Sequence, residues 1–227
     1  MVKHYDLIVF DWDGTLMDST ARIISSMQNA AELSSLPVPT STEVADIIGL
    51  SLNTAFDVLF GNDLLTPTKR DELFQNYRQQ FIADNDELMP MFPGAEALVE
   101  RLHLLGVKLA VATGKSRVGL NRALSETEVG ALFHDTICAD EANSKPDPEM
   151  LDKLSARMKV NKARMLMIGD TGHDLGMAAN AGVDSLGVTY GAQSAERLAG
   201  HRPKAILNSI EELVSWLFSE HQDVCPA

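Results

Sequence analysis

The sequence predicts an α/β fold, a doubly wound parallel sheet with a helical cap inserted after its first strand. Short apolar runs alternate with helical patterns along most of the 227 residues, and this alternation fails once, between about residues 19 and 91. Strands that alternate with helices imply a parallel sheet that is covered on both faces. We therefore expect a core made of residues 1–16 and 92–227, and a cap made of residues 17–91.

The expected core elements follow from the apolar periodicity. The first strand is the run Leu-Ile-Val-Phe at residues 7–10. Further strands are expected at residues 107–112, 136–138, 165–168, 185–189 and 205–207. Helices are expected between them at residues 95–105, 116–124, 148–158, 174–181 and 210–218. Gly106 and Gly182 follow two of these helices at a position typical of a C-terminal stop.

The expected cap contains helices only. The first covers residues 19–33, and another covers residues 52–60. Thr40 and Glu43 have the spacing of a capping box at the start of a helix between these two. Pro67 is placed to open the last helix, because proline is favoured at the first helical position. Ligands of open parallel sheets bind at the carboxyl ends of the strands, so a cap that leaves from this edge would cover the site.

Charge and composition limit the classes of function. The chain has 19 basic and 32 acidic residues, a net charge of −13, and enough hydrophobic residues (45%) for a large core. An acidic surface repels nucleic-acid phosphates and anionic lipids, so we expect neither as a partner. No run resembles a targeting or membrane-spanning segment, and Cys138 and Cys225 are expected to be unpaired thiols. A monomer in the cytoplasm is the expectation.

Polar residues recur where the predicted core strands end. They are Asp11 and Asp13, then Thr113 and Gly114, then Lys145, then Asp170 and Asp174. Each alone is compatible with an ordinary turn. In a parallel sheet, however, all of them would meet at one edge. Carboxylates crowded in this way are unfavourable unless a cation lies among them, and oxygen ligands of this kind are typical of Mg²⁺.

These four segments resemble, in order and at plausible intervals, the four motifs of the haloacid dehalogenase-like (HAD) superfamily. The first motif is Asp11-Trp12-Asp13-Gly14-Thr15. The cap resembles that of the phosphoglycolate phosphatase and β-phosphoglucomutase branch. The resemblance implies a Rossmann-like core and a Mg²⁺-dependent phosphatase. Its substrate would be a small phosphorylated metabolite, phosphoglycolate-like or a sugar phosphate, hydrolysed through an aspartyl-phosphate.

The resemblance also implies a role for each acidic residue. Asp11 would be the nucleophile and Asp13 the general acid and base. The Asp11 carboxylate, the Asp13 backbone carbonyl and the Asp170 carboxylate would hold Mg²⁺, with Asp174 as a further candidate ligand or as a residue that orients the metal and its waters.

The resemblance assigns the remaining motif residues to the phosphoryl group. Thr113 would donate its hydroxyl to a phosphoryl oxygen, Gly114 would allow close backbone approach, and Lys145 would supply a fixed positive charge. Dehalogenases lack an acid at the position of Asp13, so cleavage of a P–O bond is favoured. Phosphoryl transfer like that of β-phosphoglucomutase and a non-catalytic phospho-acceptor or binding module remain the alternatives.

Several neighbouring residues have no role in the four motifs. We expect Trp12 to be packing and His173 to be an exposed loop residue. Lys115 could reach the substrate or be solvated, and Asp140 and Glu141 could support Lys145 or form a turn. For the cap, the polar candidates for substrate contact are Asn53, Gln75 and Arg78.

Overall fold

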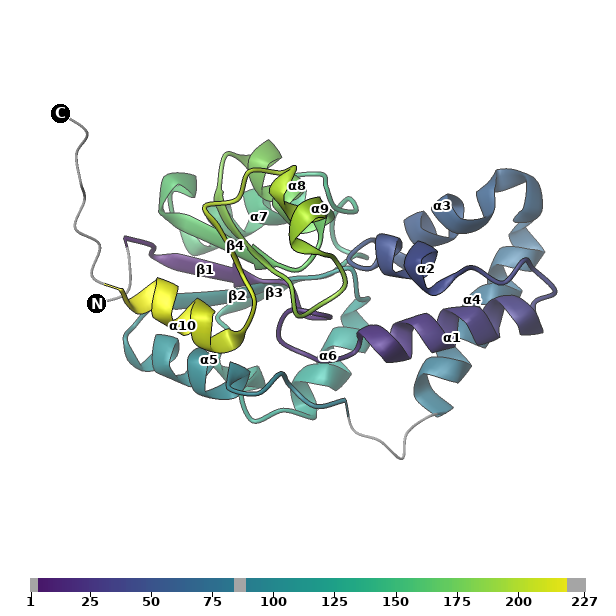
Figure 1. Ribbon diagram of the computed structural model, residues 1–227, viewed down its shortest axis with the longest axis horizontal. Coiled ribbons are helices and arrows are strands. Elements are labelled where there is room, and N and C mark those ends of the chain that lie inside the picture. The colour runs from purple at the N-terminus through teal and green to yellow at the C-terminus, as the bar shows by residue number, and fades with distance from the viewer. Residues whose placement is uncertain (1–3, 84–88, 220–227) are drawn as a thin grey trace.

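The computed structural model describes residues 4–83 and 89–219, which form an α/β core beside a helical cap (Figure 1). The core is a six-stranded sheet in the order β3-β2-β1-β4-β5-β6, and every pair of neighbours is parallel. The strands are β1 (Leu7–Phe10), β2 (Lys108–Ala112), β3 (Asp135–Ile137), β4 (Met165–Gly169), β5 (Asp184–Val188) and β6 (Ala205–Leu207). The predicted doubly wound sheet is confirmed.

Strand β1 lies where the strand order reverses. It pairs with β2 on one side and β4 on the other, and Phe10 is in register with both Val111 and Ile168. The residues that follow these strands therefore emerge side by side at one edge. This is the topological switch point at which open α/β sheets bind their ligands.

Helices cover both faces of the sheet. Ile8 and Phe10 point into one apolar core, whereas Leu7 and Val9 point into the other, as expected for a strand buried on both faces. The first core also contains residues of α5 (Ala95–Leu104), α6 (Arg117–Ser125) and α10 (Ile210–Phe218). The second contains residues of α7 (Glu149–Met158) and α8 (Gly172–Ala181).

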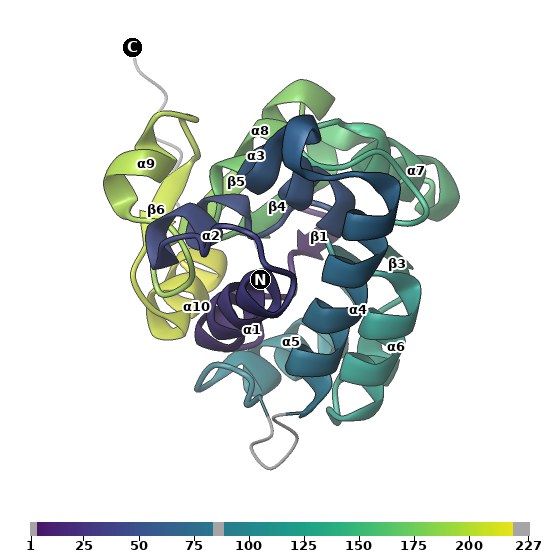
Figure 2. The ribbon, with the colours of Figure 1, turned by 90° about the vertical axis from the view of Figure 1, so that its right-hand side faces the viewer.

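In the part of the cap that the structure describes, four helices share an apolar core of their own. They are α1 (Thr20–Leu33), α2 (Ser41–Ile47), α3 (Leu52–Leu64) and α4 (Pro67–Ala83). Helices α1 and α4 pack against each other (Figure 2). The expected capping box is present, because the Thr40 hydroxyl accepts from the Glu43 backbone N–H and the Glu43 carboxylate accepts from the Thr40 backbone N–H. The two chain crossings between core and cap meet where Met17 bridges to Met91.

The element boundaries differ from the expected ones by one or two residues at most core positions. The largest consequence is at α8, which begins at Gly172 rather than at residue 174 and so includes His173 in its first turn. A short helix, α9 (Ala195–Ala199), was not expected. Among the described helices, none is both long and apolar enough to cross a lipid bilayer.

Candidate active site

Three buried carboxylates meet at the carboxyl edge of the sheet. Asp11 directly follows β1, Asp170 follows β4, and Asp174 lies in the first turn of α8. One oxygen from each lies within 4.8 Å of the others. The two loops are tightly packed, because a side chain at Gly14 would come 2.2 Å from Asp170 Oδ2. The sequence-predicted carboxylates are thus brought together.

Asp11 is the least satisfied of the three. Its Oδ1 accepts a hydrogen bond from the Trp12 backbone N–H (2.7 Å) and lies 3.0 Å from Lys145 Nζ. Its Oδ2 is buried and has no hydrogen-bond partner among the described residues. Burial raises the pKa of Asp11 to about 7, although the Lys145 ammonium opposes the shift.

The donor set fits a hard divalent cation. Burial, together with the Asp174 and Asp11 charges, also raises the pKa of Asp170. Two carboxyls that resist ionisation and an orphaned carboxylate oxygen are both stabilised by a cation placed between them. Asp11 and Asp170 are therefore suited to hold Mg²⁺, which prefers oxygen ligands.

Lys145 is buried between two acids. Its Nζ lies 3.0 Å from Asp11 and 2.6 Å from Asp174 Oδ1. Burial opposes its charge, but these two carboxylates raise the pKa of Lys145, so the ammonium is retained. The other Asp174 oxygen accepts hydrogen bonds from the Thr171 backbone and hydroxyl (3.1 and 2.7 Å). Asp174 is thus ion-paired with Lys145 as well as hydrogen-bonded, which favours a supporting role. Among the described residues, Asp170 accepts hydrogen bonds only from uncharged donors, the Thr15 hydroxyl (2.9 Å) and the Ala192 backbone N–H (2.7 Å).

Asp13 is held by two donors. Its Oδ1 accepts a hydrogen bond from Ser19 Oγ at 2.5 Å, and Lys115 Nζ lies 2.8 Å from both carboxylate oxygens. The sequence left open whether Lys115 is solvated. The structure instead makes it the ion-pair partner of Asp13.

The loop after β2 carries Thr113 and Gly114 directly beneath the cap. Thr113 is buried, and its Oγ1 accepts a hydrogen bond from the Lys115 backbone N–H at 3.2 Å. A side chain at Gly114 would come 2.4 Å from the Leu50 backbone oxygen and 2.7 Å from that of Gly49. Gly114 does allow close backbone approach, and in this structure the approaching backbone is that of the cap.

The cap presents aromatic side chains to the site, and substrate contact by its polar residues stays a prediction. Phe81 of α4 has its ring centroid 5.0 Å from Lys115 Nζ, and burial together with the Asp13 charge raises the pKa of Tyr77. Gln75 and Arg78 line an open groove of α4 together with Gln79 and Ile82. Asn53 is exposed on α3. A helix turns by about 100° per residue, so Tyr77 and Arg78 face different surroundings.

Other expectations are resolved by contacts away from the reaction centre. Trp12 is fully buried and packs edge-on against Phe133, which confirms its packing role. The expectation for His173 is wrong: it is half-buried, and its ring Nε2 lies 2.8 Å from the Asp46 backbone oxygen of the cap. The early start of α8 brings it there.

The acidic pair after β3 also has a defined partner. Asp140 accepts hydrogen bonds from the Arg117 backbone N–H, and Glu141 pairs with the Arg117 guanidinium. These contacts form a turn around Arg117 rather than a support for Lys145. Cys138 is a buried free thiol, and Cys225 lies outside the described residues.

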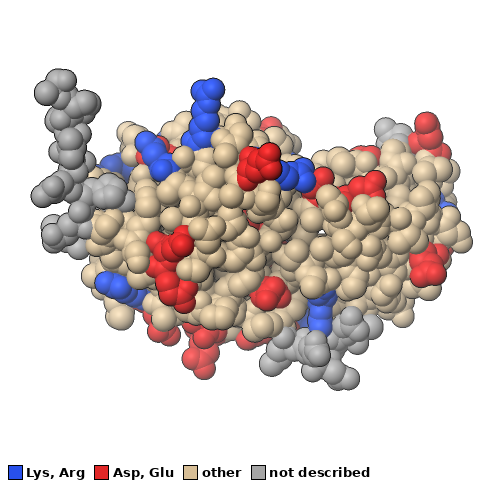
Figure 3. Space-filling model, viewed as in Figure 1, with Lys and Arg blue, Asp and Glu red and all other residues tan. Residues whose placement is uncertain are grey.

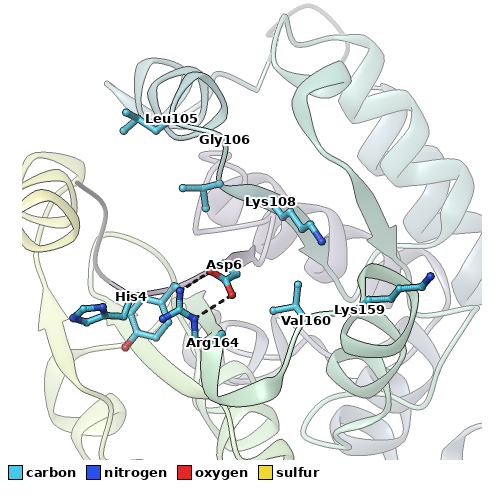
Figure 4. A pocket seen from close by; sticks show the side chains of 10 residues that line it. His4, Asp6, Leu105, Gly106, Lys108, Lys159, Val160 and Arg164 are labelled. Atoms are coloured by element: carbon cyan, nitrogen blue, oxygen red, sulfur yellow. Dashed lines mark hydrogen bonds and ion pairs between the residues drawn. The ribbon is translucent and has the colours of Figure 1, made fainter.

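A separate groove of about 550 Å³ lies at the opposite edge of the sheet, at the amino ends of β1, β2 and β4 (Figure 4). There Arg164 forms an ion pair with Asp6 at 2.6 Å, and Lys108 Nζ donates to the Met158 backbone oxygen. The sequence-predicted site residues do not line this groove. The candidate chemistry therefore belongs to the carboxyl edge.

Comparison with known proteins agrees with this placement. The family described as haloacid dehalogenase-like hydrolase matches residues 8–188. A Dickeya dadantii protein named "Probable phosphatase IndB" is 33% identical over 214 residues, covering 92% of this chain and 91% of its own length. Pyrophosphatase PpaX of Anoxybacillus flavithermus is 30% identical, covering 92% of this chain and 95% of its own.

Phosphoglycolate phosphatase of Vibrio cholerae is 29% identical over 219 residues, covering 94% of this chain and 97% of its own. Among solved structures, a hydrolase from Pseudomonas syringae has the same fold, with a TM-score of 0.81 at 21% identity and coverage of 92% of this chain and 96% of that one. The match to the family extends from the first core strand to the fifth. The chain is therefore a member of the haloacid dehalogenase-like hydrolase family.

Proposed function

We propose that this enzyme is a Mg²⁺-dependent phosphatase that hydrolyses a small phosphorylated metabolite through an aspartyl-phosphate on Asp11. The observation that carries the proposal is the arrangement at the end of β1. There a buried nucleophile candidate is ion-paired to Lys145, and a second carboxylate, Asp13, is held two residues away. Relatives named for phosphatase, pyrophosphatase and phosphoglycolate phosphatase support the same class of reaction.

In the first step, a carboxylate oxygen of Asp11 bonds to phosphorus while the bond from phosphorus to the leaving oxygen breaks. Asp13 gives a proton to that oxygen as it leaves. In the second step, Asp13 takes a proton from water, and the water oxygen attacks phosphorus and releases Asp11 as a carboxylate. Ser19 fixes the position of Asp13 for both steps through the hydrogen bond from its Oγ.

The remaining residues bind charge. Asp11, the Asp13 backbone carbonyl and Asp170 are proposed to hold Mg²⁺, with Asp174 supporting Lys145. When bound, Mg²⁺ supplies positive charge that offsets the repulsion between the phosphoryl oxygens and the nucleophile. Lys145 and the Thr113 hydroxyl are proposed to bind the phosphoryl oxygens, beside the Gly114 backbone.

The proposal includes the organisation of the chain. The core is assigned to residues 1–16 and 92–227 and the cap to residues 17–91, with crossings near Met17 and Met91. A cytoplasmic location fits the buried free thiol of Cys138, since free thiols persist in reducing compartments. We propose a monomer.

The test uses the purified full chain with p-nitrophenyl phosphate and with 2-phosphoglycolate. Phosphate release should require Mg²⁺, stop on exhaustive chelation and return when Mg²⁺ is restored. Full activity after chelation would refute the metal assignment, and no release from either ester or from a wider panel would refute the phosphatase. Incubation with β-glucose 1-phosphate and a bisphosphate primer separates the mutase, because net isomerisation faster than phosphate release would favour transfer.

A further inference from the structure

One ion pair at the site is not used by the proposed phosphoryl chemistry. Lys115 Nζ lies 2.8 Å from both oxygens of Asp13, and the two side chains are only 10% and 11% exposed. An ion pair this deep is screened far less than a surface pair. Its position therefore bears on what the site binds.

The two lysines of the site contact different aspartates. Lys145 contacts Asp11 and Asp174, so its charge lies at the end where the phosphoryl group would be attacked. Lys115 contacts Asp13, the residue proposed to protonate the leaving oxygen. The Lys115 ammonium thus lies on the leaving-group side of the bond that breaks.

An anionic leaving group needs such a local charge. The chain has a net charge of −13, and acidic side chains are spread over both the core and the cap on the face in Figure 3. A carboxylate or second phosphate on the substrate would be repelled by the general field. A lysine placed beside that anionic group can replace the repulsion with a local attraction.

Two aromatic side chains of the cap lie beside the Lys115 ammonium. The Phe81 ring lies 5.0 Å from Lys115 Nζ and 5.9 Å from the Tyr77 ring. Aromatic faces attract a cation and exclude water, which strengthens any ion pair formed there.

We propose that Lys115 is a specificity-determining residue that selects phosphoesters whose leaving group carries a second anionic group, a carboxylate or a phosphate, within a few bonds of the scissile oxygen. This inference rests on the proposed phosphatase function. The second anionic group of the substrate forms an ion pair with Lys115 in place of Asp13. The Asp13 carboxyl is then free to act on the leaving oxygen. A neutral sugar or alcohol offers no such partner, so Lys115 stays bound to Asp13.

The test compares two substrates that differ only in this charge, 2-phosphoglycolate and its carboxamide. The wild type should prefer the carboxylate in kcat/KM by at least about 30-fold, the usual effect of removing one partner from a buried charge pair. Lys115→Met should bring the ratio of the two kcat/KM values close to one, mainly by raising KM for the carboxylate. Lys115→Arg should restore most of the preference, because it keeps the positive charge.

The matched control is Lys162→Gln, a partly exposed lysine paired with Asp152 and distant from the carboxyl edge, which should keep the wild-type ratio. A wild type that hydrolyses the amide as well as the carboxylate would overturn the inference, as would a folded Lys115→Met enzyme that keeps the preference. If Lys115→Met fails to fold, the wild-type ratio and Lys115→Arg still decide. Hydrolysis of p-nitrophenyl phosphate by the wild type reports separately on the phosphatase, so the failure of the two proposals is distinguishable.

Discussion

The core and the cap place functional side chains in different ways. In the core, Asp11, Lys145 and Asp170 lie far apart in sequence yet meet because each follows a strand of the same parallel sheet. In the cap, Tyr77 stacks on Phe81, which lies beside Lys115, whereas its sequence neighbour Arg78 lines an open groove. Residues that follow parallel strands meet at one edge of the sheet even when they are far apart in sequence. Consecutive residues of a helix instead point in different directions.

The two regions should therefore respond differently to mutation. Substitutions at strand ends of the core should abolish chemistry, and those in the cap should alter binding. Five predictions test this contrast, from the largest expected effect to the smallest.

The first concerns the two aspartates after β1. Asp11→Asn should lower turnover by more than about 10⁴-fold, because no aspartyl-phosphate can form. Asp13→Asn should still react once with p-nitrophenyl phosphate, whose leaving group hardly needs a proton, and then stall. A burst of about one equivalent of nitrophenolate is expected, with the phosphoryl group found on Asp11 by intact mass and peptide mapping. Steady turnover by Asp13→Asn, or a phosphoryl adduct on Asp11→Asn, would contradict these roles.

The second compares a core lysine with a cap lysine. Lys145→Met should reduce kcat by about 10²- to 10³-fold, since the charge aimed at the phosphoryl oxygens is lost. It should also destabilise the fold by about 3–5 kcal/mol, because Asp11 and Asp174 are left buried without their partner. Lys69→Met, which removes a partly exposed cap lysine, should change kcat and the free energy of unfolding only slightly. Near-normal kcat in a folded Lys145→Met enzyme would contradict the proposed role of Lys145 in binding the phosphoryl oxygens.

The third tests the contact between the two regions. Gly114→Ala should lower kcat/KM by about 10- to 100-fold, because the new methyl group displaces the Leu50 backbone and with it the cap. Gly119→Ala in α6 is the control, since its methyl group would meet the nearest atom at 3.4 Å. Gly114→Ala should also lower the thermal unfolding temperature, because its methyl group overlaps the Gly49 and Leu50 backbone, whereas Gly119→Ala should not. Equal kinetics for the two would show that the cap does not rest on Gly114 during turnover.

The fourth concerns two side chains of α4, one beside Lys115 and one on an open groove. Phe81→Ala should reduce kcat/KM by about 5- to 30-fold, the range expected for loss of a partly desolvated cation–π contact to Lys115. Arg78→Ala should stay within about twofold, as is usual for surface positions. Steady-state kinetics with 2-phosphoglycolate measures both. A larger effect at Arg78 than at Phe81 would contradict the assignment of Phe81, rather than Arg78, to the site.

The fifth concerns pH and the metal. The pKa of Asp11 is raised to about 7 in the folded protein, above its unfolded value, so the folded state binds an extra proton and loses stability as pH rises through that value. Mg²⁺ replaces that proton. It should therefore raise the melting temperature by several degrees at pH 8, about what ligand linkage gives at saturating metal, and by less at pH 5.5. For Asp170→Asn, Mg²⁺ should change the melting temperature little. An equal rise in melting temperature at both pH values in the wild type would contradict the prediction.

The sequence by itself determined the sheet, the four-helix cap and the set of strand-end residues. Strand periodicity and the parallel alternation are local signals, and the sheet edge then brings Asp11, Asp13, Lys145 and Asp170 together without further information. The capping box at Thr40 was readable for the same reason, since both partners lie within four residues.

Only the tertiary structure decided which charges pair and which cap face is used. The contacts of Lys115 with Asp13 and of Gly114 with Leu50 join segments 102 and 64 residues apart. Another such contact, between His173 and Asp46, depends on where α8 starts. Side-chain pairing of this kind depends on the rotation and docking of whole helices, which propensity and spacing do not encode. Local patterns fix where polar residues leave the sheet, and packing fixes what each of them meets.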